Sequence, residues 1–344
     1  MSELGLGTYP LGGALITSGS YWSGPATYGA VAGEEAVATV RAGLARGLNF
    51  VDTAPNYAAA EEFIGTALRQ AALPAGGAPP GGEWGAGSRA GWPGGGRCYV
   101  ATKCGEHVRP NPATPAAAPE LARDFSRGAL RESLARSRRR LGLERLPLVL
   151  LHSPEDDELG EDPLGLLVEL RQRGEIEHVG ESARSVQRAV RLIGRDGRAE
   201  VIQVPFNLLE PAATRRLLPL AAERGVGIVV RSPLASGFLT GTIGEDHVFG
   251  PDDHRSALSR QRIVAQVRRA RAFAWLVDEG IAGSLAGAAL RYILSFPGVS
   301  TVIAGAMRRE ELGANLDAVE PGPLPEAVLA RIARTQQELG LLGA

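Results

Sequence analysis

Short apolar runs alternate with longer amphipathic stretches along most of the chain. The runs predict strands at residues 3–8, 48–53, 98–103, 146–152, 176–181, 200–206, 227–232 and 300–305. The helical spacing of apolar positions predicts helices at residues 33–47, 60–71, 126–142, 163–174, 185–197, 212–225, 284–296 and 308–319. Several of these stretches end in Gly, a common residue at helix C-termini.

Eight strand–helix units over about 300 residues favour a (β/α)8 TIM barrel, an α/β fold, as a single domain across residues 1–344. A doubly wound Rossmann sheet is the alternative. Its glycine fingerprint is missing, because in "GLGTYP" Pro10 stands at the third glycine position and no helix begins there. A barrel predicts catalytic groups at the C-terminal ends of its strands.

One segment interrupts this pattern. Residues 73–97 are rich in Gly and Pro and contain Trp84 and Trp92. They join a predicted helix to the next strand, so we expect a flexible insertion on the face opposite the catalytic one, with subunit contacts through the tryptophans as the alternative. Three long segments follow strands instead, at residues 9–33, 104–126 and 233–258. We expect these to shape a substrate pocket.

Composition excludes several classes of protein. The formal net charge is −1 and charged residues make up 22% of the chain, which argues against a nucleic-acid or membrane surface. Cys98 and Cys104 flank a strand about 20 Å long, too far apart for a disulfide. Together with an N-terminus that lacks the pattern of a signal peptide, this predicts a cytoplasmic location. No His or Cys spacing predicts a metal site.

The chain contains a single lysine, Lys103, among 37 basic residues. It ends the third predicted strand, Asp52 ends the second and His152 ends the fourth. Tyr57 follows Asp52 by five residues. Each residue alone has a structural explanation, as a helix cap, a packed aromatic or a core histidine. Four ionisable groups at one rim of a barrel are harder to explain by packing.

The chemistry of these four groups fits together. A tyrosine with a pKa of about 10 is a weak acid at neutral pH, and a nearby ammonium is expected to lower that pKa. Asp52 would hold the ammonium, in a slot too small for the planar fork of an arginine. His152 would orient a substrate oxygen by a hydrogen bond. The arrangement predicts a proton donor beside a polarised carbonyl.

The chain resembles the aldo-keto reductase superfamily over nearly its whole length. The resemblance is carried by "NFVDTAPNY", "VATK", "LLHSP", "VIQVPFNLL", "RSPLASGFLTG" and "ALRYILSFPGVSTVIAGA". It implies that Asp52, Tyr57, Lys103 and His152 form a catalytic tetrad with Tyr57 as general acid. It also implies a nicotinamide cofactor that binds across the top of the barrel.

The resemblance further implies the cofactor contacts. Gln203 and Ser182 would bind the carboxamide, although Ala183 replaces the usual Asn, and Phe206 would stack on the nicotinamide. The segment after the seventh strand would bind the pyrophosphate. The helix after the eighth strand has an N-terminus that favours anions, and there Arg308 or Arg309 would bind a 2′-phosphate, which favours NADP over NAD. Met307 and Glu311 depart from the basic residue and the Gln that the family often has at these positions, so the choice between NADP and NAD stays open. The full set of expected cofactor residues is Ser182, Gln203, Phe206, Arg231, Ser232, Pro233, Leu234, Gly237, Leu239, Gly241, Ala304, Gly305, Met307, Arg308, Glu311 and Asn315.

Tyr21, Trp22 and His107 are the candidates for the substrate pocket, with His254 as a further histidine in a top loop. The leading hypothesis is a nicotinamide-dependent reductase of an aldehyde or ketone. A sugar 1-dehydrogenase that works in the oxidative direction is the second. A cofactor-binding sensor or regulatory subunit with little turnover is the third. Substrate, reaction direction and oligomeric state stay open.

Overall fold

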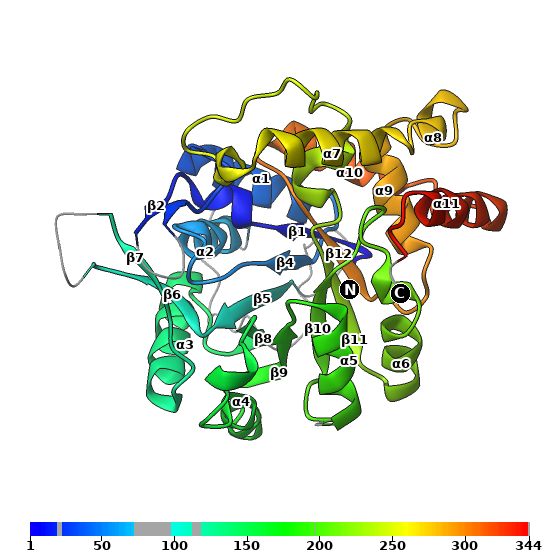
Figure 1. Ribbon diagram of the computed structural model, residues 1–344. Helices are drawn as coiled ribbons and strands as arrows, with labels where there is room; N and C mark the ends of the chain where they lie inside the picture. The colour runs from blue at the N-terminus through cyan, green and yellow to red at the C-terminus, as the bar shows by residue number, and fades with distance from the viewer. Residues whose placement is uncertain (19–22, 72–97, 112–117, 196, 343–344) are drawn as a thin grey trace.

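The computed structural model describes residues 1–18, 23–71, 98–111, 118–195 and 197–342. Eight parallel strands form a closed barrel in the order β1-β12-β11-β10-β9-β8-β5-β4. They are β1 (Leu4–Gly7), β4 (Phe50–Asp52), β5 (Tyr99–Cys104), β8 (Leu146–His152), β9 (Ile176–Ser182), β10 (Val201–Pro205), β11 (Gly227–Arg231) and β12 (Thr301–Gly305). The prediction of a (β/α)8 barrel is therefore confirmed, as Figure 1 shows.

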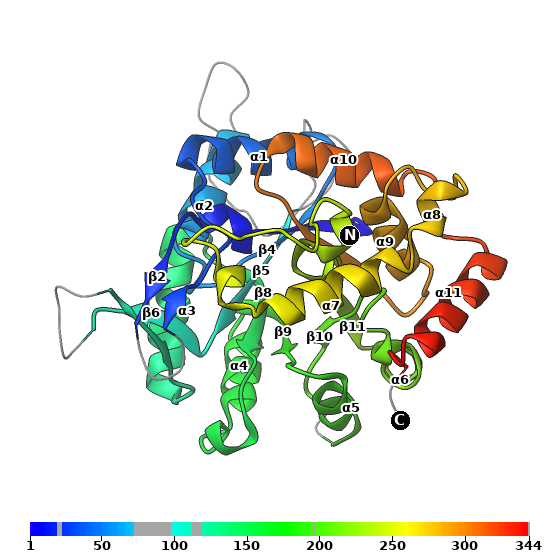
Figure 2. The ribbon, with the colours of Figure 1, turned by 45° about the horizontal axis from the view of Figure 1, so that its top comes forward.

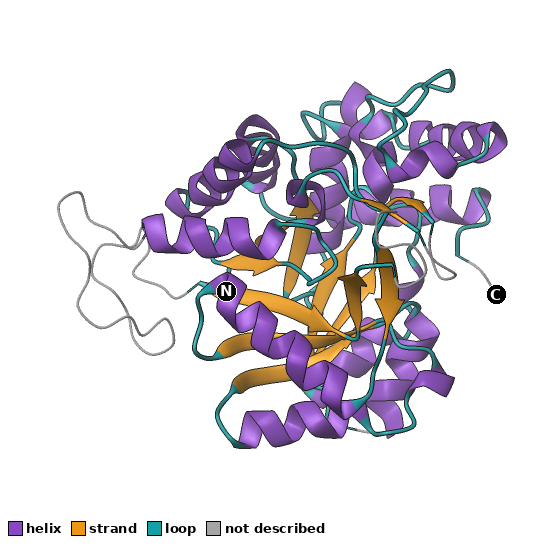
Figure 3. Ribbon diagram, turned by 90° about the vertical axis from the view of Figure 1, so that its left-hand side faces the viewer, coloured by secondary structure: helices purple, strands orange, loops and turns teal. Residues whose placement is uncertain are grey.

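Eight helices follow the eight strands and enclose the barrel, with the strands inside and the helices outside (Figure 3). They are α1 (Gly33–Ala45), α2 (Ala60–Ala71), α3 (Arg127–Leu141), α4 (Pro163–Gln172), α5 (Val186–Arg195), α6 (Leu217–Arg224), α9 (Leu285–Leu294) and α10 (Arg309–Val319). All eight lie within the predicted helical ranges. None of the helices in the described ranges is long and apolar enough to cross a membrane.

Several elements were not expected from the sequence. Helices α7 (Arg260–Arg271), α8 (Trp275–Asp278) and α11 (Glu326–Glu338) lie outside the eight units, and Figure 2 shows α7 in front of the barrel. The predicted top loops contain two short ribbons, β2 (Ile16–Thr17) with β3 (Gly24–Pro25) and β6 (Glu106–Arg109) with β7 (Glu120–Arg123). They also contain the 3₁₀ turns η1 (Tyr9–Gly12), η4 (Ala235–Thr240) and η5 (His254–Ala257). Two further turns are η2 (Asp156–Glu158) and η3 (Ala212–Thr214).

Alternation along the strands divides the core in two. One set of side chains fills the barrel interior with Phe50, Ala101, Leu148, Leu150, Val229 and Ile303. The opposite set packs against the helices in a larger cluster. Because side chains alternate with a period of two, the next inward position after Phe50 is Asp52, and the next after Ala101 is Lys103. The same alternation that builds an apolar interior thus places ionisable groups at its upper end.

Two expectations from the sequence concern the cysteines and the Gly- and Pro-rich insertion, which belong to no proposed catalytic group. Cys98 and Cys104 are both free thiols, and burial raises the pKa of Cys98 to about 12. The insertion at residues 73–97, with Trp84 and Trp92, lies outside the described residues.

Candidate active site

Lys103 is the centre of a buried hydrogen-bond network at the upper end of the barrel. Its Nζ donates to Asp52 Oδ1 at 2.8 Å and Oδ2 at 2.9 Å, to the Thr53 carbonyl oxygen at 2.9 Å, and to the Tyr57 hydroxyl at 3.2 Å. The side chain is 0% exposed. Four oxygens around one compact ammonium explain why this position requires lysine, since a planar guanidinium cannot point its donors at the same four atoms.

Tyr57 is held by close backbone packing. It lies between β4 and α2, where its amide donates to the carbonyl oxygen of Ala54. A Cβ added at Gly12 would lie 2.0 Å from the Tyr57 carbonyl oxygen, so the segment before α1 approaches as closely as only glycine allows. The Tyr57 ring contacts the edge of Tyr9, with 5.1 Å between ring centroids. The phenol is therefore fixed over the lysine rather than free in a loop.

The pKa of Tyr57 moves in the direction opposite to that expected from the sequence. Burial raises it well above its ordinary value, and the Asp52 carboxylate raises it further, while Arg231 acts in the opposite direction. Desolvation outweighs the nearby positive charge because the charged phenolate loses far more hydration on burial than the neutral phenol. Tyr57 is consequently protonated at neutral pH, which is the form that a proton donor requires.

His152 is neutral for a related reason. Burial, followed by the charges of Lys103 and Arg231, holds its pKa well below the ordinary value of a histidine. Its buried Nδ1 lies 3.5 Å from Oε2 of Glu106 without forming a hydrogen bond, and this oxygen accepts one from Asn56 Nδ2 at 3.1 Å. Glu106 was missed from the sequence, because it belongs to the β6–β7 ribbon in a segment predicted as a loop.

The expected carboxamide-binding pair is connected to this network. Ser182 Oγ donates to Gln203 Oε1 at 2.9 Å, and Gln203 Nε2 donates to Asp52 Oδ2 at 2.8 Å. All three side chains are buried. Ala183, in place of the usual Asn, is buried and its amide donates to the Gln203 carbonyl oxygen at 2.8 Å. The structure thus joins Gln203 and Ser182 to the tetrad through Asp52.

Phe206 does not lie in this site. Gln203 points into the barrel, so Phe206, three residues later, points outward. Its ring is fully buried against Tyr292 and Phe296, with centroids 5.5 Å and 5.4 Å away. The expectation that Phe206 stacks on nicotinamide is corrected by this alternation. On the neighbouring strand β11, the next inward position after Val229 is Arg231, which lines the cavity.

A cavity of about 550 Å³ opens above the tetrad. Its walls include expected cofactor residues, namely Gln203, Arg231, Ser232, Pro233, Leu234, Gly237, Gly305, Met307 and Glu311. Ala304, Leu239 and Asn315 are instead buried in the surrounding core. The segment from Ser232 to Gly241 is tightly wound, and Ser232 (φ 54°), Ala235 (φ 47°) and Ser236 (φ 54°) adopt positive φ without being glycine. Such backbone is uncommon and concentrates at ligand-binding loops.

The arginines expected to bind a 2′-phosphate are already paired. Arg308 lies 3.0 Å from Glu311, whose other oxygen accepts the Met307 amide at 2.8 Å. Arg309 lies 3.2 Å from Glu35. Both guanidiniums are exposed at the start of α10, near the cavity wall formed by Met307 and Glu311. A phosphate would have to compete with these carboxylates.

The structure places only one of the candidate substrate-pocket residues that it describes in the cavity wall. His107 lies half-buried on the β6–β7 ribbon and is not part of the cavity wall. Tyr21 and Trp22 lie outside the described residues. His254 does line the cavity, with its ring 4.5 Å from that of Tyr28. Sequence reasoning missed Tyr9, Tyr28, Phe249 and Arg255 in the same wall, because nothing in their spacing indicates that separate loops bring them together.

An eight-stranded parallel barrel with a cluster of Asp, Lys and His buried beneath a half-buried Tyr in a cavity defines a class of barrel oxidoreductases. The chain matches the family model described as "Aldo/keto reductase family" over residues 3–337, and it belongs to this family. Members of this family are NAD(P)-dependent oxidoreductases, and the protein is an enzyme of this kind.

Relatives illustrate the range of the family. The NADH-specific methylglyoxal reductase of Escherichia coli (strain K12) is 28% identical over 258 residues, which cover 73% of this chain and 69% of that protein. The D-threo-aldose 1-dehydrogenase of a Pseudomonas species is 29% identical over 229 residues, or 61% of this chain and 63% of that protein. The structure of a glycerol dehydrogenase from Gluconobacter oxydans aligns with a TM-score of 0.75 at 24% identity, covering 100% of this chain and 94% of that one. This last likeness concerns the fold alone.

The residues present fit a nicotinamide cofactor. The cavity is lined by Gln203, whose amide is an acceptor and donor pair, and by the tightly wound segment after β11. In addition, Arg231 Nε is buried with no hydrogen-bond partner. A buried polar atom without a partner at a cavity wall indicates a site shaped for a ligand.

Proposed function

We propose that the protein reduces an aldehyde or ketone to an alcohol, with Tyr57 as the proton donor and a reduced nicotinamide as the source of hydride. The observation that supports this most directly is the contact of the Lys103 ammonium with the Tyr57 hydroxyl at 3.2 Å, beneath a cavity large enough for ligands. Lys103 is fully buried and Tyr57 is half-buried at the cavity wall, so the ammonium is shielded from bulk water while the phenol can reach a substrate.

Each member of the tetrad has a distinct part in this proposal. Tyr57 donates its proton to the carbonyl oxygen while the carbonyl carbon accepts the hydride. Lys103 stabilises the phenolate that is left, and Asp52 keeps the lysine charged despite its burial. His152, which is neutral, orients the carbonyl oxygen. The phenolate regains a proton from solvent after the alcohol leaves.

For the cofactor we propose NADP(H), bound through Gln203 and Ser182 at the carboxamide and through the Ser232–Gly241 segment at the pyrophosphate. Arg308 and Arg309 would exchange their partners Glu311 and Glu35 for a 2′-phosphate. The E. coli relative is named as NADH-specific, so the preference of this protein for NADPH or NADH has to be measured directly. The ratio of kcat/KM for NADPH and NADH gives the answer. Replacing Arg308 and Arg309 by Ala should lower that ratio about tenfold.

Oxidation of a sugar is the second candidate. It is favoured by relatives named as D-threo-aldose 1-dehydrogenase and L-galactose dehydrogenase. Tyr9 and Tyr28 also give the cavity an aromatic wall of the kind that packs on sugar rings.

A panel of aldehydes, ketones and aldoses, followed by nicotinamide absorbance with both cofactors in both redox states, separates the two functions. Turnover confined to aldoses with oxidised cofactor would replace the proposed reduction by sugar oxidation. Tight cofactor binding with no turnover anywhere in the panel would instead indicate a sensor or regulatory protein.

A further inference from the structure

Arg231 holds a position that the proposed mechanism does not use. It ends β11 and lines the cavity together with Gln203 and Tyr57. Its Nη2 donates to the Ala183 carbonyl oxygen at 3.3 Å, just past the end of β9. Since β10 lies between β9 and β11, the side chain crosses the upper end of β10, the strand that carries Gln203.

Asp52 and Glu210 act on this guanidinium from a distance, and neither carboxylate forms an ion pair with it. The structure records no ion pair for Arg231 among the residues it describes, and Nε is buried without a hydrogen-bond partner. Arg255, in the wall of the same cavity, shows the usual arrangement, with its Nη2 2.6 Å from Asp253 Oδ2. An arginine keeps its charge in proteins, and a buried charge is normally paired. Arg231 therefore adds to the floor of the cavity a positive charge that no carboxylate of the described residues contacts directly, while Asp52 and Glu210 act on it only from longer range.

The charge lies where the proposed function places the nicotinamide. If Gln203 and Ser182 bind the carboxamide, the ring attached to it lies against the guanidinium that crosses the upper end of β10 beside them. The ring is neutral in the reduced cofactor and carries a positive charge in the oxidised one. A cation is attracted to a neutral π system and repelled by a like charge, and both effects are strong where water is excluded.

We infer that Arg231 makes this site select the reduced cofactor over the oxidised one. The inference rests on the proposed function, because it assumes nicotinamide at Gln203 and Ser182. Weaker binding of the oxidised form raises the midpoint potential of the bound couple, by about 30 mV for each tenfold ratio of dissociation constants. The solution equilibrium of the overall reaction is unchanged. Oxidised cofactor leaves readily after a reduction, and its inhibition of the enzyme is weak.

The test is a pair of binding titrations on the full chain. Dissociation constants are measured for NADPH by its fluorescence and for NADP⁺ by calorimetry, with NADH and NAD⁺ in parallel. The variants are Arg231→Gln and Arg231→Met, which remove the charge, and Arg231→Lys, which keeps it. Arg255→Gln is the matched control, since it removes a cavity arginine whose charge Asp253 already balances. Circular dichroism shows which variants are folded.

We expect the ratio of the oxidised to the reduced dissociation constant to fall about tenfold in the neutral variants, mainly through tighter binding of the oxidised form. Arg231→Lys should keep most of the original ratio, and Arg255→Gln should leave the ratio unchanged. An unchanged ratio in a folded neutral variant would overturn the inference, as would a selective loss of affinity for acidic substrates with no effect on the cofactor. If the original protein binds neither redox form, the proposed function fails as well, and the two failures are thus distinguishable.

Discussion

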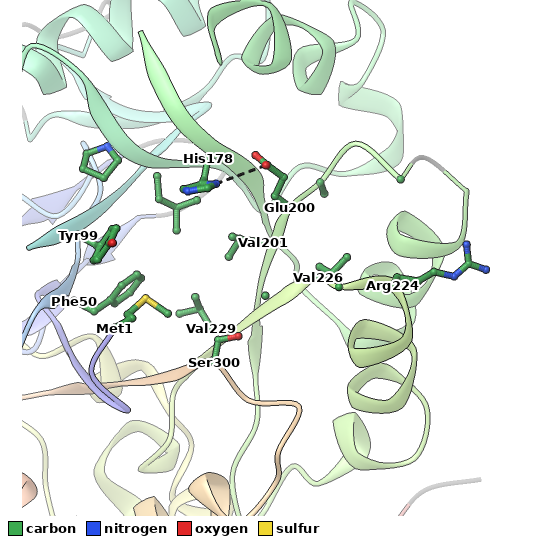
Figure 4. Close-up of a pocket in the computed structure, with 16 residues that line it drawn as sticks. Met1, Phe50, Tyr99, His178, Glu200, Val201, Arg224, Val226, Val229 and Ser300 are labelled. Carbon is green, nitrogen blue, oxygen red and sulfur yellow. Dashed lines mark ion pairs between the residues drawn. The ribbon is translucent and has the colours of Figure 1, made fainter. Parts of the chain in front are cut away.

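The barrel has a cavity at each end, and the two cavities differ in how far their ionisable side chains are buried. The upper cavity, of about 550 Å³, has Asp52, Tyr57 and Gln203 in its wall. The lower cavity, of about 440 Å³, is lined near the strand starts by side chains that include Phe50, Tyr99 and Val229 (Figure 4). Size alone does not distinguish them.

The two cavities differ in how deeply their ionisable groups are buried. In the lower cavity the ionisable pair is His178 with Glu200, 3.6 Å apart, and the histidine side chain is 52% exposed. In the upper cavity Lys103 and Asp52 are 0% and 3% exposed. Water screens the exposed pair, whereas burial in the upper site shifts the pKa values of Tyr57, Lys103 and His152. A catalytic site is recognised here by ionisable groups that the fold has removed from water.

The sharpest test of this contrast exchanges one tyrosine at each end of the barrel. Tyr57→Phe should lower kcat about 10³-fold, because the proton donor is lost, and should leave cofactor affinity within about twofold. Tyr99→Phe, in the wall of the lower cavity, should change kcat by less than about twofold. Steady-state kinetics and cofactor titration on both variants give the result. Equal losses at both ends would remove the functional distinction between the cavities.

Lys103→Arg should reduce kcat about 10²-fold although the charge is retained. The guanidinium cannot place its donors on the two Asp52 oxygens, Thr53 and Tyr57 at once, and its larger volume strains a fully buried slot. Kinetics together with thermal unfolding separate a catalytic loss from a folding loss. Wild-type turnover in this variant would mean that position 103 requires only a positive charge.

Phe206→Ala tests the boundary of the upper site. Because the ring packs on Tyr292 and Phe296, its removal should lower the free energy of unfolding by about 3 kcal/mol through the cavity it leaves. Cofactor affinity of the folded variant should stay within about threefold. Urea unfolding and cofactor titration are the measurements. A large loss of affinity in a protein of normal stability would return Phe206 to the binding site.

The smallest expected effect concerns acid stability. Burial holds the pKa of His152 well below that of the unfolded chain, so the unfolded state binds more protons below pH about 6.5. The stabilisation is complete above that pH and is lost as the pH falls toward the folded-state pKa, by about 1 kcal/mol between pH 7.5 and 5.5. His152→Gln should reduce this loss, measured by urea unfolding at both pH values. His178→Gln, which replaces a histidine with a 52% exposed side chain, is the control for a histidine substitution at the surface.

The sequence predicted the site correctly where strand periodicity determines the direction in which a side chain points. Asp52, Lys103 and His152 were placed correctly, because parallel strands bring their C-terminal ends to one rim and inward positions alternate. The same rule would have excluded Phe206, which lies an odd number of residues after the inward Gln203. The family motif places Phe206 at the cofactor, whereas the alternation of side chains along the strand places its ring outside the barrel interior, and the structure agrees with the alternation.

Other features could not be predicted in this way. Tyr9, Tyr28 and His254 meet only because the segments after β1 and β11 fold toward one another, and no local pattern encodes that contact. The direction of the Tyr57 pKa was also inaccessible. A sequence shows which charges are near a phenol, whereas the dominant contribution is desolvation, which depends on how completely the neighbouring segments cover it.

The closure of the barrel has a consequence for how the protein is made. Strand β1 pairs with β12, so that Leu4 lies beside Val302 and the barrel is sealed by residues from the two ends of the sequence. During synthesis β1 can pair early with β4, whereas its other neighbour, β12, follows only after about 300 further residues. Contacts between such distant residues slow folding. Until β12 is made, β1 keeps one edge with unpaired backbone N–H and C=O groups. Such an edge can pair with other chains, so we expect chaperone binding to matter most during this interval.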